Sequence, residues 1–269
     1  MKYDPIKKVL GRFFSGSLFM RKSFYFMLDL LLLRTWHVKR VLRMVSAGYS
    51  NDMKILDAGC GFGQYTWRMS RMNSFSRIKA VDIDSEHIAD CAAFFDNSGL
   101  SDRIFLETLD LTKLSETSCY DLILSVDVME HIEEDEKVFG NFCNALRDKG
   151  SLIISTPSDK GGSDVHSEHE DSFIGEHVRD GYSRIDITEK LTRAGFGKIN
   201  VKYTYGLPGN ISWRLSMKYP IKMLNISYLF FIVLPFWYLI FFPVTLILNY
   251  LDLKISHKEG TGLLVIAQK

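Results

Sequence analysis

The stretch Ile55-Leu-Asp-Ala-Gly-Cys-Gly-Phe-Gly63 decides the fold of this chain. It begins as an apolar run typical of a buried strand and ends in glycines at alternate positions, 59, 61 and 63. Glycine permits left-handed backbone angles and lets a ligand approach the main chain closely. A helix-compatible segment follows from Gln64 to Met72. The stretch therefore predicts a strand, a tight turn and a helix whose positive end faces the turn.

The spacing of these glycines bears on the kind of ligand. Turns that bind the pyrophosphate of a dinucleotide have the pattern Gly-x-Gly-x-x-Gly. Here the third glycine comes one residue earlier, and the carboxylate of Asp57 lies inside the turn. A carboxylate at this place suits a ligand that carries positive charge. The alternative is a tight glycine turn that binds nothing.

The run Asp57-Ala-Gly59-Cys-Gly61-Phe-Gly63 resembles motif I of the class I S-adenosylmethionine-dependent methyltransferases. The resemblance extends over residues 55 to 205 and the final strand. It implies that S-adenosylmethionine is the cofactor and that the turn binds it through Asp57, Ala58, Gly59, Gly61 and Gly63.

Further cofactor contacts are expected where the next strands end. Asp82, followed by Ile83, lies 23 residues after Gly59, which is the distance at which an acid meets the ribose hydroxyls of an adenosine ligand. We expect Asp84 or Ser85 to cap the following helix, which leaves Asp82 for the ligand. The resemblance adds four residues at the same edge of the sheet, Asp110, Leu111, Ser125 and Val126.

The pattern Asp127-x-x-Glu130-His131 follows the fourth strand, at the edge where open α/β sheets bind their ligands. It resembles the Glu-x-x-Glu-His motif of ubiquinone-biosynthesis O-methyltransferases and small-RNA 2′-O-methyltransferases, with Asp127 in place of the first glutamate. The resemblance implies one of two arrangements. Either a divalent cation, Mg²⁺ or another, is held by Asp127, Glu130 and His131, or His131 acts without metal as a general base or as a group that orients the substrate. By the same resemblance His177 is a second catalytic candidate, contacting substrate or metal.

Residues 1–50 have a composition of their own, with ten basic residues against Asp4 and Asp29. The apolar run Phe24 to Leu33 between the basic clusters is too short to span a bilayer. Two compatible interpretations remain, an interfacial amphipathic helix and a helix pair that caps the core.

Residues 207–257 form an apolar insertion before the last strand. From Met223 to Leu251 there is no charged residue, a length and composition that pass the threshold for a transmembrane helix. A single crossing would separate the last strand from its sheet, and Pro235 and Pro243 are each expected to break a helix. These features predict a re-entrant or surface-embedded helical hairpin, with basic residues at both ends suited to anionic headgroups. The alternative is an apolar cap that dimerises or covers the substrate pocket.

Charge and cysteine content narrow the class of protein. The net charge of +1 argues against a polyanion binder, and the four scattered cysteines indicate reduced thiols. We predict an α/β fold with a Rossmann-like, doubly wound, seven-stranded methyltransferase sheet. The segments are an N-terminal helical cap (1–50), a cofactor-binding core (51–206), the apolar, membrane-associated insertion (207–257) and the final core strand (258–269).

The predicted function is methyl transfer from S-adenosylmethionine to a small or lipid-soluble acceptor, such as a quinone precursor, a phenolic lipid or a glycolipid. O-methylation at the cytoplasmic face of a membrane is favoured. Two alternatives are a membrane-attached binding or scaffold protein without catalysis and an RNA 2′-O-methyltransferase. The near-neutral core argues against nucleic acid as a partner. The sequence leaves open whether the protein forms an oligomer.

Overall fold

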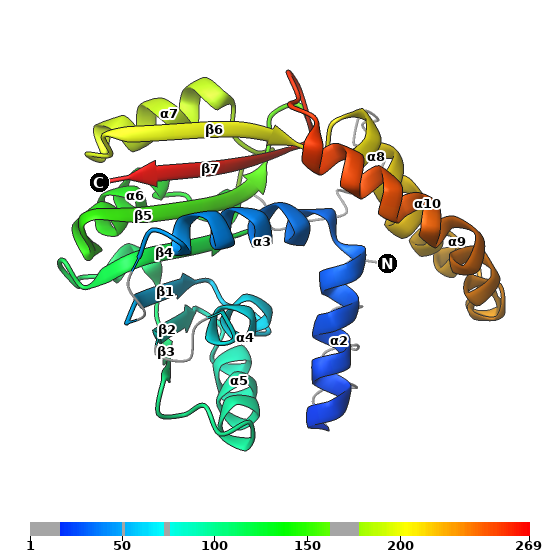
Figure 1. The fold of residues 1–269 in the computed structure, drawn as a ribbon, viewed down its shortest axis with the longest axis horizontal. Helices are drawn as coiled ribbons and strands as arrows, with labels where there is room; N and C mark the ends of the chain where they lie inside the picture. The colour runs from blue at the N-terminus through cyan, green and yellow to red at the C-terminus, as the bar shows by residue number, and fades with distance from the viewer. Residues whose placement is uncertain (1–16, 50–51, 73–75, 162–177) are drawn as a thin grey trace.

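The computed structural model describes residues 17–49, 52–72, 76–161 and 178–269. Along these residues the elements follow one another (Figure 1) as α2 (Leu18–Leu31), α3 (Leu33–Ser46), β1 (Lys54–Ala58), α4 (Gln64–Ser70), β2 (Arg77–Asp82), α5 (Ser85–Asn97), β3 (Ile104–Thr108), η1 (Leu111–Lys113), β4 (Tyr120–Val126), η2 (Met129–His131), α6 (Asp135–Ala145), β5 (Leu146–Pro157), α7 (Arg184–Arg193), β6 (Lys198–Thr204), α8 (Leu207–Trp213), η3 (Arg214–Lys218), α9 (Tyr219–Ile226), η4 (Tyr228–Ile232), α10 (Leu234–Lys254) and β7 (Gly262–Gln268).

The seven strands form one sheet in the order β3-β2-β1-β4-β5-β7-β6. Strands β1 to β5 pair in parallel, and β7 lies antiparallel between β5 and β6. The order reverses between β1 and β4, and a crevice for ligands opens at the carboxyl ends of the strands at such a point. The predicted doubly wound sheet is confirmed.

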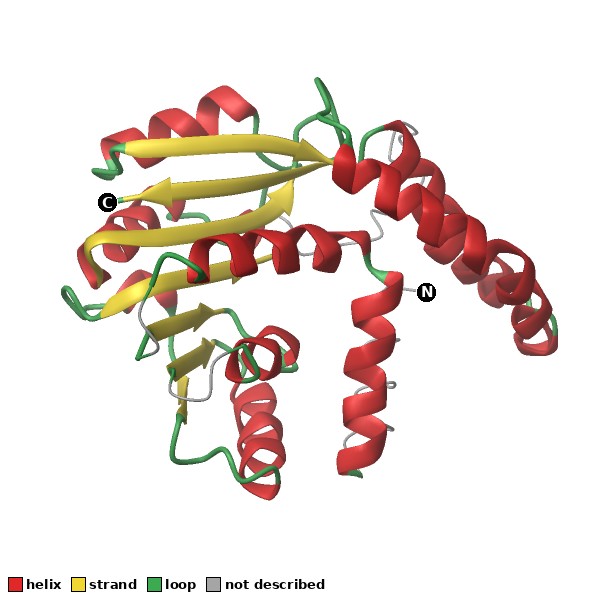
Figure 2. Cartoon of the chain, in the orientation of Figure 1, coloured by secondary structure: helices red, strands yellow, loops and turns green. Residues whose placement is uncertain are grey.

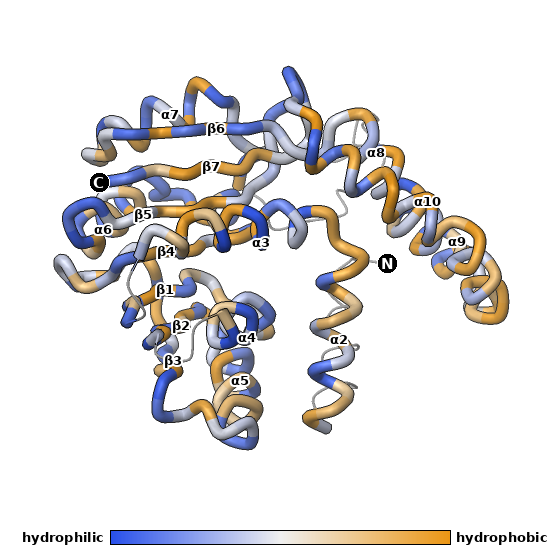
Figure 3. Tube along the Cα trace, viewed as in Figure 1, coloured by the Kyte–Doolittle hydropathy of each residue, from blue (hydrophilic) through white to orange (hydrophobic). Residues whose placement is uncertain are grey.

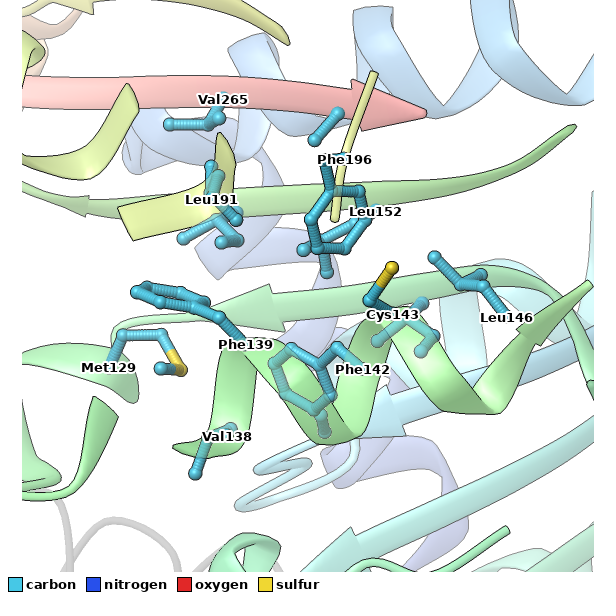
Figure 4. Close-up of a cluster of buried hydrophobic side chains, with 14 of the residues drawn as sticks. Met129, Val138, Phe139, Phe142, Cys143, Leu146, Leu152, Leu191, Phe196 and Val265 are labelled. Carbon is cyan, nitrogen blue, oxygen red and sulfur yellow. The ribbon is translucent and has the colours of Figure 1, made fainter. Parts of the chain in front are cut away.

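Helices cover both faces of the sheet, so the molecule has three layers (Figure 2). On one face Val138, Phe139 and Phe142 of α6 pack with residues of β4, β5 and β7, and Figure 4 shows Phe139 and Phe142 beneath β5. On the other face the core is built by α3, α4 and α5, with Leu42 and Phe95 almost fully buried. Strands buried on both sides hold their carboxyl ends in a fixed register.

The helix after β4 differs from the expectation at its end. Acids in the first turn, Asp135 and Glu136, match the helix dipole as predicted. The helix ends at Ala145, however, with no base in its last turn. Arg147, Lys149 and Gly150 belong to β5, because the chain turns directly into the pairing of Leu146 with Tyr120.

The apolar insertion forms an antiparallel helical hairpin that projects from the sheet (Figure 1). One arm is α8, the π-helical turn η3 and α9, and the returning arm is α10. Pro235 lies at the start of α10, where a missing N–H costs nothing. The expectation that Pro243 breaks a helix is wrong, because α10 continues through it. A helix tolerates a proline where its neighbours hold the backbone in place.

Helix α3 lies across one face of the sheet, and α2 runs from its start along the side where the parallel strands end (Figure 1). Leu32 has an extended backbone between them, so the chain bends sharply there. Both α2 and the hairpin carry long apolar stretches (Figure 3). The parallel strands thus end between two apolar projections.

Candidate cofactor and acceptor site

The glycine turn after β1 has the backbone that its sequence predicts. Gly59, Gly61 and Gly63 have φ angles of 81°, 49° and 75°. A Cβ on Gly59 would lie 2.2 Å from Val128 Cγ2, so this glycine permits close packing against the segment after β4. A Cβ on Gly61 would meet nothing within 4 Å. The main chain at Gly61 therefore borders open space in which a ligand can lie against it.

Asp82 at the end of β2 is tied to this turn. Its carboxylate accepts hydrogen bonds from the backbone N–H of Gly61 (2.8 Å) and of Asp84 (2.9 Å). Burial by itself would raise its pKa, but the hydrogen bonds from His87, Asp84 and Gly61 outweigh burial and lower the pKa. The ionised carboxylate still has lone pairs for the two hydroxyls of a ribose.

The residues on either side of Asp82 also fit the expectation. Ile83 exposes 74% of its surface, which leaves an apolar side chain for an aromatic ring of a ligand. Asp84 caps α5 by accepting from the N–H of Glu86, as the sequence predicts. Asp84 is thus the helix cap that the sequence predicts, which leaves Asp82 for a ligand.

Asp57 is buried at the end of β1, where the hydroxyl of Thr66 in α4 donates to its carboxylate. Burial raises the pKa of Asp57 to about 7. A carboxylate that is costly to ionise gains a counter-charge when a cationic ligand binds beside it. The sulfonium and ammonium groups of S-adenosylmethionine are such charges, so the site fits this cofactor.

The other predicted cofactor residues differ in how they can reach a ligand. The side chains of Ala58, Leu111 and Ser125 are buried in the sheet and beneath it, whereas Val126 is half-buried. Asp110 lies at the rim, but one of its carboxylate oxygens already accepts from the N–H (2.9 Å) and hydroxyl (2.8 Å) of Thr112. These bonds lower the pKa of Asp110. Ala58 and Leu111 can therefore contact a ligand through the main chain.

The acid–histidine pattern does not assemble as a metal site. Asp127 has a left-handed φ of 53°, and its carboxylate pairs with the guanidinium of Arg34 from α3. Glu130 is buried and accepts from the hydroxyl of Thr156 at 3.1 Å. His131 is exposed. Among the residues that the structure describes, no group of three or more His, Cys, Asp or Glu side chains could hold a metal ion.

The segment after the fifth strand fixes the turn that carries His131. The N–H of Val178 donates to the carbonyl of Glu130, and Arg179 donates to the carbonyl of Ile132 at 2.7 Å. The hydroxyl of Tyr182 donates to the carboxylate of Asp135 at 2.7 Å. His177, the second catalytic candidate, lies outside the described residues.

The sequence left open a helix pair that caps the core, but it did not indicate which N-terminal residues reach the glycine turn. Arg21 of α2 is buried and donates to the carbonyl of Phe62 (2.8 Å), between two glycines of the turn, and to Asp90. The hydroxyl of Tyr25 also donates to the Phe62 carbonyl. The one signal for these contacts is an arginine four residues before a tyrosine within an apolar helix, because such a pair shares one helix face.

Comparison with known proteins agrees with this geometry. Residues 49–195, more than half of the chain, match the family model described as "Methyltransferase domain". The chain belongs to the methyltransferase-domain family. Its glycine turn, Asp82 and the segment after β4 all lie within the matched residues, so this family is the class I, S-adenosylmethionine-dependent one that motif I predicts.

The methyltransferase domain is similar to curated proteins over part of their length. It is 25% identical over 130 residues to the mitochondrial ubiquinone biosynthesis O-methyltransferase of Candida albicans, which covers 48% of this chain and 38% of that protein. The chain spans between 28% and 48% of the length of the first curated relatives that it matches.

Two solved structures share the fold. Phosphoethanolamine N-methyltransferase 2 of Haemonchus contortus, in complex with S-adenosyl-L-methionine, has a TM-score of 0.61 at 17% identity over 82% of this chain and 49% of that one. An S-adenosylmethionine-dependent methyltransferase of Mesorhizobium loti has a TM-score of 0.52 at 18% identity over 84% and 96%. At this identity the likeness shows the fold of the methyltransferase domain.

Proposed function

We propose that this chain transfers the methyl group of S-adenosylmethionine to a hydroxyl of a lipid-soluble acceptor, at the cytoplasmic face of a membrane. The observation that carries the proposal is the carboxylate of Asp82, which holds the N–H of Gly61 beside open space. This arrangement lies at the carboxyl edge of a methyltransferase sheet, next to an apolar hairpin that is largely exposed.

The residues of the chain divide the chemistry among them. S-adenosylmethionine supplies an electrophilic methyl group, and its transfer breaks the carbon–sulfur bond, forms the oxygen–carbon bond and releases the hydroxyl proton. The glycine turn, Asp57 and Asp82 hold the cofactor and align its methyl group, since alignment lowers the barrier to an in-line displacement. His131 accepts the proton that the acceptor loses. The guanidinium of Arg34 forms an ion pair with the carboxylate of Asp127, so this role of His131 requires no metal ion.

Two observations support a lipid-soluble acceptor. The helix α10 is long and apolar enough to cross a membrane, and 11% of its most apolar window is buried. The hairpin to which it belongs projects from the edge of the sheet where the parallel strands end (Figure 1). The name of the Candida albicans relative, an O-methyltransferase of ubiquinone biosynthesis, supports oxygen as the methylated atom.

The cytoplasmic face is supported by the cysteines. In the described part of the chain all four cysteines are free thiols, and Cys60, Cys91 and Cys143 are buried. Free thiols persist in a reducing compartment.

The proposal is tested with methyl-labelled S-adenosylmethionine and a detergent-dispersed lipid extract from cells that lack this gene. We expect label in the organic phase, and none with the variant Asp82→Ala. An RNA extract offered in parallel tests the other acceptor class. The proposed acceptor would be refuted if the label entered RNA. It would also be refuted if the protein bound the cofactor but neither extract became labelled.

A further inference from the structure

The helical hairpin has a one-sided charge. Between residues 207 and 251 it contains three basic residues, Arg214, Lys218 and Lys222, and no acidic residue. All three lie on the outgoing arm, in η3 and α9. The returning helix α10 has no charge before Asp252. Such a charge distribution is complementary to an anionic surface.

The packing of the two arms sets where these bases point. The outgoing arm contacts α10 at the buried residues Ser212 and Ser216, and Pro220, four residues further along, is buried as well. The hydroxyl of Ser212 lies 2.7 Å from the side-chain oxygen of Asn249, and the hydroxyl of Tyr238 donates to the Ser216 carbonyl at 2.8 Å.

Each base follows one of these buried residues by two positions. Residues two apart on a helix point in nearly opposite directions. Arg214, Lys218 and Lys222 therefore form a row, the basic row, on the side of the hairpin away from α10.

The outer side of α10 is apolar along its whole length. Its buried residues Thr245, Asn249 and Asp252 face the rest of the protein. Large exposed side chains recur every three or four positions on the other side, namely Phe236, Leu239, Ile240, Val244, Ile247, Tyr250 and Leu251. We call this surface the α10 outer face; it continues into the exposed tip at Leu229, Phe231 and Ile232.

We propose that the hairpin lies flat in one leaflet of an anionic membrane. The α10 outer face then lies among the acyl chains. The axis of the outgoing arm lies about one helix spacing farther from the bilayer centre, roughly 8–10 Å, and carries the basic row at the level of the headgroups. The inference rests on the proposed function at a membrane surface and specifies how the membrane binds.

The flat orientation follows from the position of the basic row. If α10 crossed the bilayer, the antiparallel arm would carry Arg214, Lys218 and Lys222 into the hydrocarbon beside it, where charged side chains are strongly disfavoured. An orientation in the interface leaves each base in contact with lipid phosphates while the α10 outer face leaves water. A second copy of this chain would cover the α10 outer face, but its own hairpin offers no acidic residue between positions 207 and 251 to meet the basic row.

The base of the hairpin fixes this orientation relative to the sheet. Asp252 is fully buried and accepts from Nε2 of His37 in α3 (2.8 Å) and from the N–H of Gly209 in α8 (3.0 Å). The same carboxylate lies 3.1 Å from Nε2 of His257. Asp252 also accepts from the N–H of Tyr205 after β6 (3.2 Å). A hairpin held to α3 and to the end of β6 cannot swing freely, so a bilayer that binds it lies beside the carboxyl edge of the sheet.

The test measures depth in the membrane along α10. Nitroxide labels are attached to the single variants Phe236→Cys, Ile240→Cys and Ile247→Cys in the full chain carrying Cys119→Ser. Accessibility to oxygen and to a water-soluble nickel reagent is then measured on vesicles of phosphatidylcholine with phosphatidylglycerol. We expect the three labels at one shallow depth, and a label at the exposed Glu189→Cys in water. A depth that increases steadily from position 247 to position 236 would overturn the flat orientation.

Charge reversal tests the role of the basic row. The double variant Lys218→Glu/Lys222→Glu should lose vesicle binding by more than roughly tenfold, whereas Lys198→Glu/Lys202→Glu on the edge strand β6, which changes the net charge equally, should bind normally. Equal loss in both variants, or a soluble dimer with spin–spin broadening at position 247 and no vesicle binding, would overturn the proposal. Calorimetric binding of S-adenosylmethionine and methyl transfer in detergent are measured on the same proteins. If both persist while vesicle binding of the wild type fails, this inference and the membrane location are wrong, and the proposed methyl transfer to a lipid-soluble acceptor stands.

Discussion

Arg34, at the start of α3, forms an ion pair with Asp127, which follows β4 in a left-handed backbone conformation. The N–H of Arg34 also donates to the hydroxyl of Tyr205, at the end of β6, at 3.0 Å. These contacts bring the N-terminal helices, the acid–histidine turn and the base of the hairpin together. The N-terminal helix pair thus covers the acid–histidine turn.

This ion pair leads to the first prediction. Because Arg34 neutralises the first acid of the pattern, we expect turnover to be unchanged by a chelator such as EDTA. His131→Ala should lower the rate by on the order of 10²-fold through loss of the general base, with cofactor affinity unchanged. Activity that falls with EDTA and returns with Mg²⁺ would restore the metal interpretation. Full activity of His131→Ala would remove both roles.

The sheet and the cofactor side of the site were predictable from sequence because their signals are local. An apolar strand followed by alternate glycines allows few backbone paths, and an acid directly after the next strand lies beside the turn. Gly61 and Asp82 are accordingly joined by a hydrogen bond at the turn, and Asp57 lies at the end of β1 before it; that these residues bind the cofactor stays a prediction.

The acceptor side depends on contacts between distant segments, which no local pattern encodes. Arg21 and Arg34 belong to the basic N-terminal segment, for which the sequence left open an interfacial helix and a helix pair that caps the core; they pair with Asp90 and Asp127 of the core. Likewise the contacts of Asp252 with His37 and Gly209 join segments that are far apart in the sequence, so no local pattern indicates them.

The second prediction concerns the pH dependence of stability. The pKa of Asp57 is about 7 in the folded protein because the group is buried, and it is about 3.9 in an unfolded chain. The folded state therefore holds a proton that the unfolded state releases, and the free energy of unfolding falls as pH rises between these values.

Replacing Asp57 with Asn removes this loss of stability at higher pH, because asparagine does not ionise. Without cofactor, the free energy of unfolding of Asp57→Asn minus that of the wild type should rise by roughly 2–3 kcal/mol between pH 5 and pH 8. Urea unfolding at both pH values measures it. A difference that does not change with pH would show that Asp57 is ionised throughout.

The third prediction separates ligand contact from backbone strain with two matched glycines. Gly61 and Gly99 both have left-handed φ angles, 49° and 67°, and a Cβ on either would meet nothing within 4 Å. Alanine at either position should cost roughly 1–2 kcal/mol of stability. Gly61→Ala should in addition weaken cofactor binding strongly, because its methyl group projects into the open space at the turn, whereas Gly99→Ala should bind normally. Equal affinities by calorimetry would move the cofactor away from Gly61.

The fourth prediction concerns the anchor of the hairpin. Burial alone would raise the pKa of Asp252, but the hydrogen bond from His37 and the neighbouring His257 hold it below its usual value. Asp252→Ala should lower the free energy of unfolding by roughly 3–5 kcal/mol at neutral pH, compared with little effect for the exposed Glu259→Ala. A depressed pKa contributes stability above about pH 4 that is lost as pH falls further. The difference in the free energy of unfolding between Asp252→Ala and the wild type should therefore become smaller in acid. A difference that does not depend on pH would argue against an ionised Asp252.

The most direct test of the account is a calorimetric titration of the folded chain with S-adenosylmethionine. The account predicts one site per chain. Asp82→Ala should weaken binding by roughly 1.5–3 kcal/mol, the contribution of hydrogen bonds to a charged group. Asp84→Ala, two residues away, should lose about 1 kcal/mol of stability as a helix cap and keep the wild-type affinity. The account would be contradicted if the folded wild-type chain bound no S-adenosylmethionine, or if Asp82→Ala bound it as tightly as the wild type.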